Sequence, residues 1–244
     1  MSKVLMTILT AALLLTASGL TAPMDDALAA LNRGQPSVTV ALLRDNRDAP
    51  ALSLLARAYV GQSVLVDGRP EKQRLYAASE AAARAAVAAD GRAAEGYVEL
   101  ANALALQLQG AGVVRATRTG LEIRRLFEQA LKLDPAQARA WMGLGTWHAQ
   151  ALGLGALVVL TTGASEDTMR MSHQKAIALA PGEIFFRLSY ADSLLLLAGQ
   201  DVRRATGLRQ EARHLLEGAL ALKPQTYWQK YDQEQVRERL RGLP

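Results

Sequence analysis

The feature that most constrains this chain is a helix–break–helix unit at residues 126–148. Phe127 and Ala130 are spaced three apart, which places them on one face of an amphipathic helix. Pro135 cannot continue that helix because proline lacks a backbone N–H, although it suits the first turn of the next helix. The same spacing resumes from Trp141 onward. The stretch therefore predicts two helices that pack back on one another.

The unit recurs along the chain. Each copy ends in a glycine or proline, and these breaks are separated by 44, 46 and 43 residues: Gly91, Pro135, Pro181 and Pro224. A large residue followed directly by a small one also recurs at nearly the same interval. These pairs are Leu55-Ala56, Leu100-Ala101, Leu144-Gly145 and Tyr190-Ala191. Small residues suit sites where two helix axes approach closely, because a larger side chain holds the axes apart. A stack of similar helix pairs is expected.

The pattern from Phe127 to Gly145 resembles the tetratricopeptide (TPR) repeat, and the other copies share it. The usual repeat of that family is about 34 residues, so each copy here carries extra loop or helix. The resemblance implies an all-α, right-handed solenoid of about four TPR-like helix hairpins over residues 23–244. A mixed polar and aromatic segment at 225–240 is expected to be a solvent-facing capping helix on an open stack.

Apolar spacing and break residues divide the chain into expected helices. These lie at residues 24–33, 37–43, 51–60, 70–89, 93–109, 121–133, 135–160, 169–179, 183–197, 202–222 and 225–240. Residues 61–68 are expected to form a loop or a frayed turn. Segment 37–43 stays open between helix and strand because Val38 and Val40 are β-branched. Ser165 is expected to cap the helix that follows it.

The composition favours a helical core without a nucleic-acid partner. Half of the 244 residues are hydrophobic, which is enough for a sizeable core. Abundant alanine and few β-branched runs argue against a sheet. The net charge of +5 comes mostly from scattered arginines, whereas nucleic-acid-binding chains more often show a basic stripe with interleaved aromatic residues. The scattered charge is consistent with solvation and a weak attraction to anionic lipid.

The N-terminal segment indicates export. Lys3 precedes apolar residues 4–15, which are too few for a comfortable membrane span, and small residues follow. This order predicts a bacterial signal peptide over residues 1–22, cleaved after Gly19 or Ala22. A periplasmic location is expected, with an uncleaved inner-membrane anchor as the alternative. The chain has no cysteine, which excludes attachment of lipid at a lipobox and excludes disulfides.

No catalytic or metal-binding motif is present in the sequence. The chain has three histidines: His148, His173 and His214. None shows metal-ligand spacing, and no carboxylate pair accompanies them. Gly153 and Gly155 lack the strand and third glycine of a dinucleotide fingerprint. We therefore expect no enzymatic activity, no metal and no cofactor, and a packing role for His173.

In the TPR family, the first helix of each pair lines a concave groove. The resemblance places eight residues in that groove: Ser53, Arg57, Val98, Asn102, Met142, Thr146, Leu188 and Asp192. This mixture suits an extended peptide, because the Asn102 amide can both donate to and accept from a main chain. A periplasmic protein-interaction scaffold with a protein or peptide partner is the expected function. The alternative is that the eight are ordinary surface residues.

The apolar run at 151–160 suggests a second function. Exposed apolar patches often contact lipid or small hydrophobic ligands, and here Trp147, His148 and Leu157 are the expected contacts. Ten residues are too few to span a bilayer as a helix. Burial of the run against neighbouring helices is the alternative. A third possibility is an assembly subunit whose stack packs only on itself.

Overall fold

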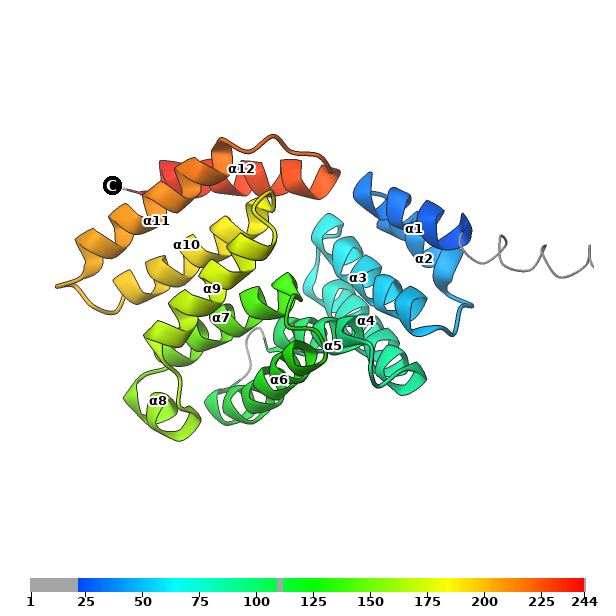
Figure 1. Cartoon of the computed structure of the whole chain (residues 1–244), viewed down its shortest axis with the longest axis horizontal. Coiled ribbons are helices and arrows are strands. Elements are labelled where there is room, and N and C mark those ends of the chain that lie inside the picture. The colour runs from blue at the N-terminus through cyan, green and yellow to red at the C-terminus, as the bar shows by residue number, and fades with distance from the viewer. Residues whose placement is uncertain (1–21, 109–111, 244) are drawn as a thin grey trace, which may run out of the picture.

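The computed structural model describes residues 22–108 and 112–243, and within them it contains twelve α-helices and no β-strand (Figure 1). The predicted all-α fold is therefore confirmed. The predicted signal peptide at 1–22 lies outside the described residues except for Ala22. The last residue of the helix expected at 93–109 likewise lies outside them.

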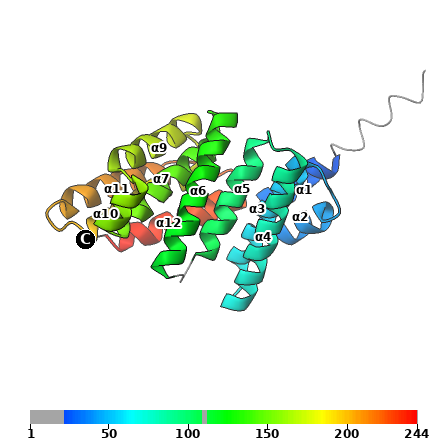
Figure 2. The same ribbon diagram turned by 90° about the horizontal axis from the view of Figure 1, so that it is seen from below.

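Ten of the helices form five antiparallel hairpins. They are α1 (Ala22–Asn32) with α2 (Pro36–Leu43), α3 (Ala49–Leu65) with α4 (Arg69–Ala89), α5 (Ala94–Gln107) with α6 (Val113–Leu133), α7 (Ala138–Gly153) with α9 (Glu166–Leu179), and α10 (Ile184–Ala198) with α11 (Ala205–Leu220). Helix α8 (Ala156–Thr162) is inserted in the fourth hairpin, and α12 (Tyr227–Arg241) follows the last. The hairpins succeed one another in chain order from α1 and α2 to α10 and α11 (Figure 2).

The small residues of the repeat do lie at close helix contacts. A Cβ added to Gly145 would lie 2.7 Å from the ring of His173, and one added to Gly143 would overlap the ring of Phe127. Ala130 is fully buried. His173 is buried too, and its ring stacks on Tyr190 with centroids 4.9 Å apart. The predicted packing role of these residues is therefore confirmed.

Two large clusters of buried apolar side chains and a small one of Met142, Ala176 and Phe186 form the core. One extends from α1 to α8 and includes Leu55, Leu100 and Phe127. The other joins α7 and α9 to the last three helices and includes Met169 and Leu194. Each hairpin buries its apolar face against the next, which is how a stack of repeats builds a core that no single repeat has alone.

Several predicted boundaries are wrong. Helix α3 continues through residues 61–65, and α6 begins at Val113 rather than at 121. Pro135 precedes α7 instead of opening it, because Asp134 forms a turn in which its side chain accepts from the Ala136 amide at 2.9 Å. Segment 37–43 is helical, so the strand alternative is also wrong. The hydroxyl of buried Thr39 donates to the Ala27 carbonyl at 2.9 Å and ties α2 to α1.

The long helix predicted from 135 to 160 is broken in two. Helix α7 ends at Gly153, and Gly155 adopts a φ of +98°, a conformation that glycine tolerates without steric cost. Helix α8 then ends at Thr162, and Gly163 caps it in the left-handed conformation with a φ of +66°. Ser165 caps α9 as predicted, since its side chain accepts from the Thr168 amide at 3.2 Å. Two glycines with positive φ thus set α8 apart from both neighbouring helices.

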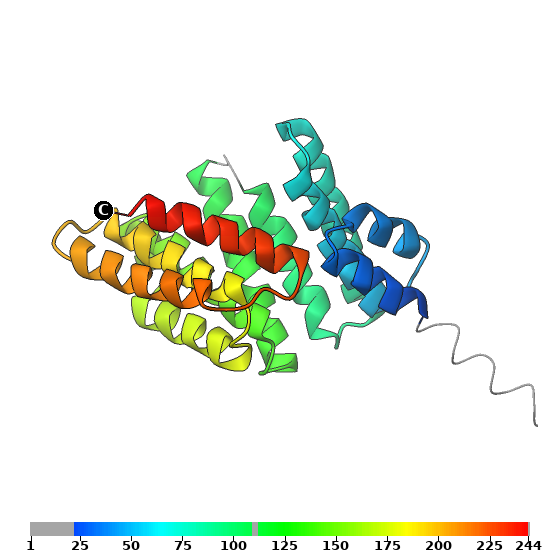
Figure 3. The ribbon, with the colours of Figure 1, turned by 90° about the horizontal axis from the view of Figure 1, so that it is seen from above.

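The stack is closed at its ends, not open as predicted. The indole Nε1 of Trp228 in α12 donates to the Leu31 carbonyl at the end of α1, at 2.7 Å. The same ring packs on Gly61 of α3, where an added Cβ would lie 3.0 Å from it. Helix α12 therefore extends from the last hairpin to the first (Figure 3). The curvature of the five hairpins brings the start of α12 next to the end of α1.

Candidate functional site

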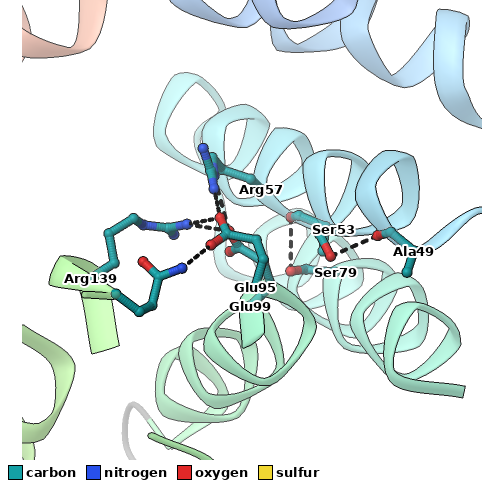
Figure 4. A network of polar contacts seen from close by, with 9 residues as sticks. Ala49, Ser53, Arg57, Ser79, Glu95, Glu99 and Arg139 are labelled. Carbon is teal, nitrogen blue, oxygen red and sulfur yellow. Dashed lines mark hydrogen bonds and ion pairs between the residues drawn. The ribbon is translucent and has the colours of Figure 1, made fainter. Parts of the chain in front are cut away.

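Polar side chains connect the first helices of successive hairpins. We call the surface of α3, α5, α7, α10 and α12 that carries these contacts the inner face. Its centre is a network in which Glu99 accepts from Arg57 at 2.9 Å and also pairs with Arg139 (Figure 4). Glu95 pairs with the same two arginines and accepts from Gln137 at 2.8 Å. The network joins α3, α5 and α7.

Two carboxylates and two guanidinium groups balance the charge of this network. The Glu99 side chain is only 1% exposed, whereas those of Arg57, Glu95 and Arg139 are about one third exposed. Burial raises the pKa of Glu99, but Arg139 and Arg57 outweigh that effect and hold its pKa below the ordinary value. Glu99 is therefore a buried anion that fixes two partly exposed cations.

The row of contacts continues from α7 to α12. The hydroxyls of Thr146 and Ser189 are hydrogen-bonded at 2.9 Å and join α7 to α10. Arg239 of α12 donates to Asp192 of α10 at 2.6 Å. Because α12 also contacts α1 and α3 through Trp228, the contacts form a closed circuit around the inner face.

A second acidic pair lies where α12 meets the start of α10. Burial together with the nearby Glu183 carboxylate raises the pKa of Asp232 to about 7. Gln229, one turn earlier in α12, donates to Glu183 at 3.1 Å. This part of the inner face therefore changes its charge near neutral pH.

Four residues predicted to line the groove are buried instead: Ser53, Val98, Met142 and Leu188. Their exposures range from 0 to 9%. The hydroxyl of Ser53 is used within its own helix, where it donates to the Ala49 carbonyl at 2.8 Å. The prediction that these four contact a ligand is wrong for this structure, because their side chains fill the contacts between neighbouring hairpins.

The other four predicted groove residues lie on the inner face. Arg57, Thr146 and Asp192 are partly exposed, but each is already bonded to a neighbouring helix. Asn102 is half-buried, and its side chain makes no hydrogen bond to another described residue. Asn102 is therefore the predicted site residue whose amide is available to a partner.

Sequence reasoning missed the acidic centre of the network. Neither Glu95 nor Glu99 is among the eight residues predicted to line the groove. A signal was present: Arg57 and Arg139 lie 42 residues before and 40 residues after Glu99, which is close to one repeat. Opposite charges at that separation fall on adjacent first helices and can pair across them.

The predicted apolar ligand contacts are only partly accessible. Trp147 is 8% exposed, and its Nε1 donates to the Gly120 carbonyl at 2.6 Å. His148 is 3% exposed, and its Nδ1 accepts from the Ser165 amide at 3.1 Å. Their predicted role is wrong because both rings hold helices together. Leu157 is 75% exposed.

Neither a metal site nor a membrane-spanning helix is found in the described part of the chain. Within residues 22–108 and 112–243, no three acidic or histidine side chains are placed to hold a metal ion. Every helix in the same residues is too short or too polar to cross a membrane.

Comparison with known proteins gives a family and a fold. A family model described as "Regulator of microtubule dynamics protein 1-3" matches residues 25–243. The structure is similar to that of TTC0263, a thermophilic TPR protein in Thermus thermophilus, with 19% identity and a TM-score of 0.62. That match covers 89% of this chain and 98% of the other. It confirms the TPR-like fold.

A crystal structure of MamA also matches, with 17% identity and a TM-score of 0.43, covering 87% of this chain and 96% of that one. No curated protein matches the chain by sequence.

Proposed function

Because this chain belongs to the regulator of microtubule dynamics protein 1-3 family and folds as a TPR-like stack, we propose that it is a non-enzymatic protein-interaction scaffold. The proposed partner is an extended peptide or a segment of another protein that lies along the inner face. The observation that carries this proposal is the row of fixed polar groups across α3, α5, α7 and α10.

The network supports the proposal because it orients binding groups before any partner arrives. Glu99 holds Arg57 and Arg139 in place, and the exposed part of each guanidinium keeps donors free for a carbonyl or carboxylate. Pre-organised groups lose less entropy on binding than mobile ones. A main chain passing over α5 can also accept from and donate to the Asn102 amide, for about 0.5–1.5 kcal/mol net per bond.

The proposal is tested with purified wild-type protein as bait in an envelope extract, followed by affinity measurement on the captured partner. Asn102→Arg should lower the affinity tenfold or more, because the longer cation crowds the inner face one turn after Glu99 on α5. The matched control is Gln174→Arg, an exposed position on α9. Unchanged affinity in Asn102→Arg, with a native melting temperature, contradicts binding at the inner face.

The family description also makes tubulin a partner to test. Microtubule co-sedimentation with the same two variants assigns that interaction to the inner face or to another surface. Binding of tubulin that Asn102→Arg weakens would support the scaffold proposal and would argue against a periplasmic location.

We also propose that the protein is exported to a bacterial periplasm. Lys3, the apolar residues 4–15 and the small residues after them support this location. N-terminal sequencing of the native protein should begin shortly after Gly19 or Ala22. A soluble cytoplasmic chain that begins at Met1 or Ser2 would contradict export, and an intact N-terminus in the membrane fraction would indicate an anchor.

A further inference from the structure

Helix α8 carries two of the most exposed large apolar side chains in the described part of the chain. Leu157 is 75% exposed and Leu160 is 83% exposed, whereas Val158 is 8% exposed and packs in the core. No charged residue occurs in residues 149–165. The Thr161 hydroxyl is bonded to the Leu157 carbonyl at 3.0 Å. The outer side of α8 is therefore an apolar edge in contact with water.

The fold holds α8 in this orientation. Gly155 and Gly163, on either side of the helix, adopt positive φ angles of +98° and +66°. Arg124 of α6 donates to the Thr162 carbonyl at 2.6 Å and fastens the last turn of α8. The exposure of the two leucines is thus a property of the folded hairpin and not of a loose loop.

Cationic side chains lie on α6, the helix to which α8 is fastened. Val114, Arg118 and Arg125 are spaced by four and seven residues, so they form one stripe along the helix. All three are exposed, and neither arginine has an ion-pair or hydrogen-bond partner among the residues the structure describes. The exposed Glu122, which lies between the two arginines on α6, is paired instead with Arg84 of α4 at 3.7 Å. Helices α8 and α6 lie together at the lower edge of the molecule in Figure 1.

The shape of this surface distinguishes among occupants. Helix α8 projects from the stack (Figure 1), and the exposed side chains of Leu157 and Leu160 make it an apolar ridge. A protein partner would need a matching pocket, whereas a bilayer accommodates a protruding apolar side chain without one. Unpaired arginines on α6, the helix that is bonded to α8, attract anionic headgroups. The combination of apolar tips and flanking cations is typical of helices that lie in a membrane interface.

We propose that Leu157, Leu160 and the Val114–Arg118–Arg125 stripe form a docking surface for an anionic phospholipid bilayer. The two leucines enter the boundary between headgroups and acyl chains, and the arginines contact lipid phosphates. Helix α8 has seven residues, or about 10 Å of length, so it rests in the interface and does not cross it. This docking goes beyond the proposed scaffold function because it uses α6 and α8 and leaves the inner face free for a partner.

Co-sedimentation with lipid vesicles tests the proposal. Full-length protein is mixed with vesicles of phosphatidylcholine alone or of phosphatidylcholine with phosphatidylglycerol. Wild-type protein should bind the anionic vesicles, and high salt should weaken the binding. Leu157→Glu or Leu160→Glu should lower the affinity tenfold or more. The double variant Arg118→Gln, Arg125→Gln should lower it severalfold and remove the preference for anionic lipid.

Matched controls are available elsewhere on the surface. Val202→Glu places the same charge at a side chain that is 87% exposed before α11. The double variant Arg69→Gln, Arg92→Gln removes two exposed cations near the ends of α4, outside the proposed docking surface. Both should bind vesicles as the wild type does. Failure of the wild type to bind anionic vesicles, or full binding by both leucine variants, overturns the proposal. The proposal is also overturned if the wild-type protein binds no vesicles and forms a dimer that Leu157→Glu converts to monomers. The ridge would then be a contact between two copies of the chain.

Discussion

Trp228 and Leu31 are 197 residues apart in sequence, yet the Trp228 indole N–H donates to the Leu31 carbonyl at 2.7 Å. This bond, together with the packing of the Tyr227 ring on Gly34, joins the last helix to the first hairpin. It makes the stack a closed arrangement in which the inner face is bounded by the chain itself. The Trp228 ring is partly buried against the first core cluster, so apolar packing supports the hydrogen bond.

Loss of the Trp228 contact should loosen the closure. Trp228→Ala should lower the free energy of unfolding by on the order of 3 kcal/mol, because it removes a large packed ring. Trp228→Phe should cost about 1 kcal/mol, mainly through the lost hydrogen bond. Chemical denaturation measures both, and small-angle scattering should show a larger radius of gyration for Trp228→Ala. Tyr231→Phe is the control. If Trp228→Ala leaves both the radius of gyration and the unfolding midpoint unchanged, the closure between α12 and α1 does not depend on this contact.

Among the charged side chains, the buried Glu99 carboxylate should be the one whose loss lowers the free energy of unfolding most. Glu99→Gln removes the anion between Arg57 and Arg139 and should cost on the order of 3 kcal/mol, since two cations lose their buried counter-charge. Thermal and urea unfolding measure the change. Glu71→Gln is the control, because its pair with Arg74 is exposed and should contribute nothing measurable. Equal midpoints for the two variants would mean that the network is not a stabilising element.

The close contact at Gly145 predicts a steric effect. Gly145→Ala brings a methyl group to 2.7 Å from the His173 ring, and the resulting overpacking should cost about 1–3 kcal/mol. Gly182→Ala is the matched control, since a Cβ there meets nothing within 4 Å. If Gly145→Ala is as stable as the control in denaturant, the register of α7 against α9 is wrong.

Asp232 predicts a specific pH dependence. Burial and Glu183 raise the pKa of Asp232 from an ordinary 3.8 to about 7 in the folded protein. Between these values the folded state binds a proton that the unfolded chain releases. The contribution of Asp232 to stability is therefore full below pH 3.8 and is lost as the pH rises through about 7. Asp232→Asn should be more stable than wild type at about pH 8, and this advantage should shrink toward about pH 5.

The comparison with Asp232→Asn is needed because two histidines act in the opposite sense. Burial lowers the pKa of His148 to about 4 and that of His173 to about 3, so both destabilise the fold as the pH falls below 6.5. Both proteins share these histidines, and the difference between their unfolding free energies isolates Asp232. A difference that is constant with pH would contradict a raised pKa.

The periodic part of the fold could be predicted because it depends on local chemistry. The breaks at Gly91 and Pro181 and the small residue at Gly145 recur at nearly equal intervals, and each has a steric reason. The break at Gly155 was missed because a glycine inside an apolar run resembles a weak helix position until its φ is known. The Trp228–Leu31 contact has no local signal, since it depends on the summed curvature of five hairpins.

The candidate site was less predictable than the fold. Successive side chains are rotated by about 100° around a helix, so an error of one position moves a residue off the face that lines the groove. The positions of Ser53 and Val98, each three residues before the small member of the pair, turn toward the neighbouring hairpin. The positions of Arg57 and Asn102, each one residue after it, remain partly exposed on the inner face. Side chains of opposite charge that are one repeat apart identify this surface better than groove positions inferred from the TPR family. Arg57, Glu99 and Arg139 are such a set.

The central claim is that a partner lies along the inner face, and site-specific photo-crosslinking in living cells tests it most directly. A photoreactive amino acid at Asn102 should yield a crosslinked product of defined mass, whereas the same group at Gln174 on α9 should yield none. Mass spectrometry of the product then identifies the partner. Crosslinks that form at Gln174 and are absent at Asn102, with both variants folded, would contradict the claim.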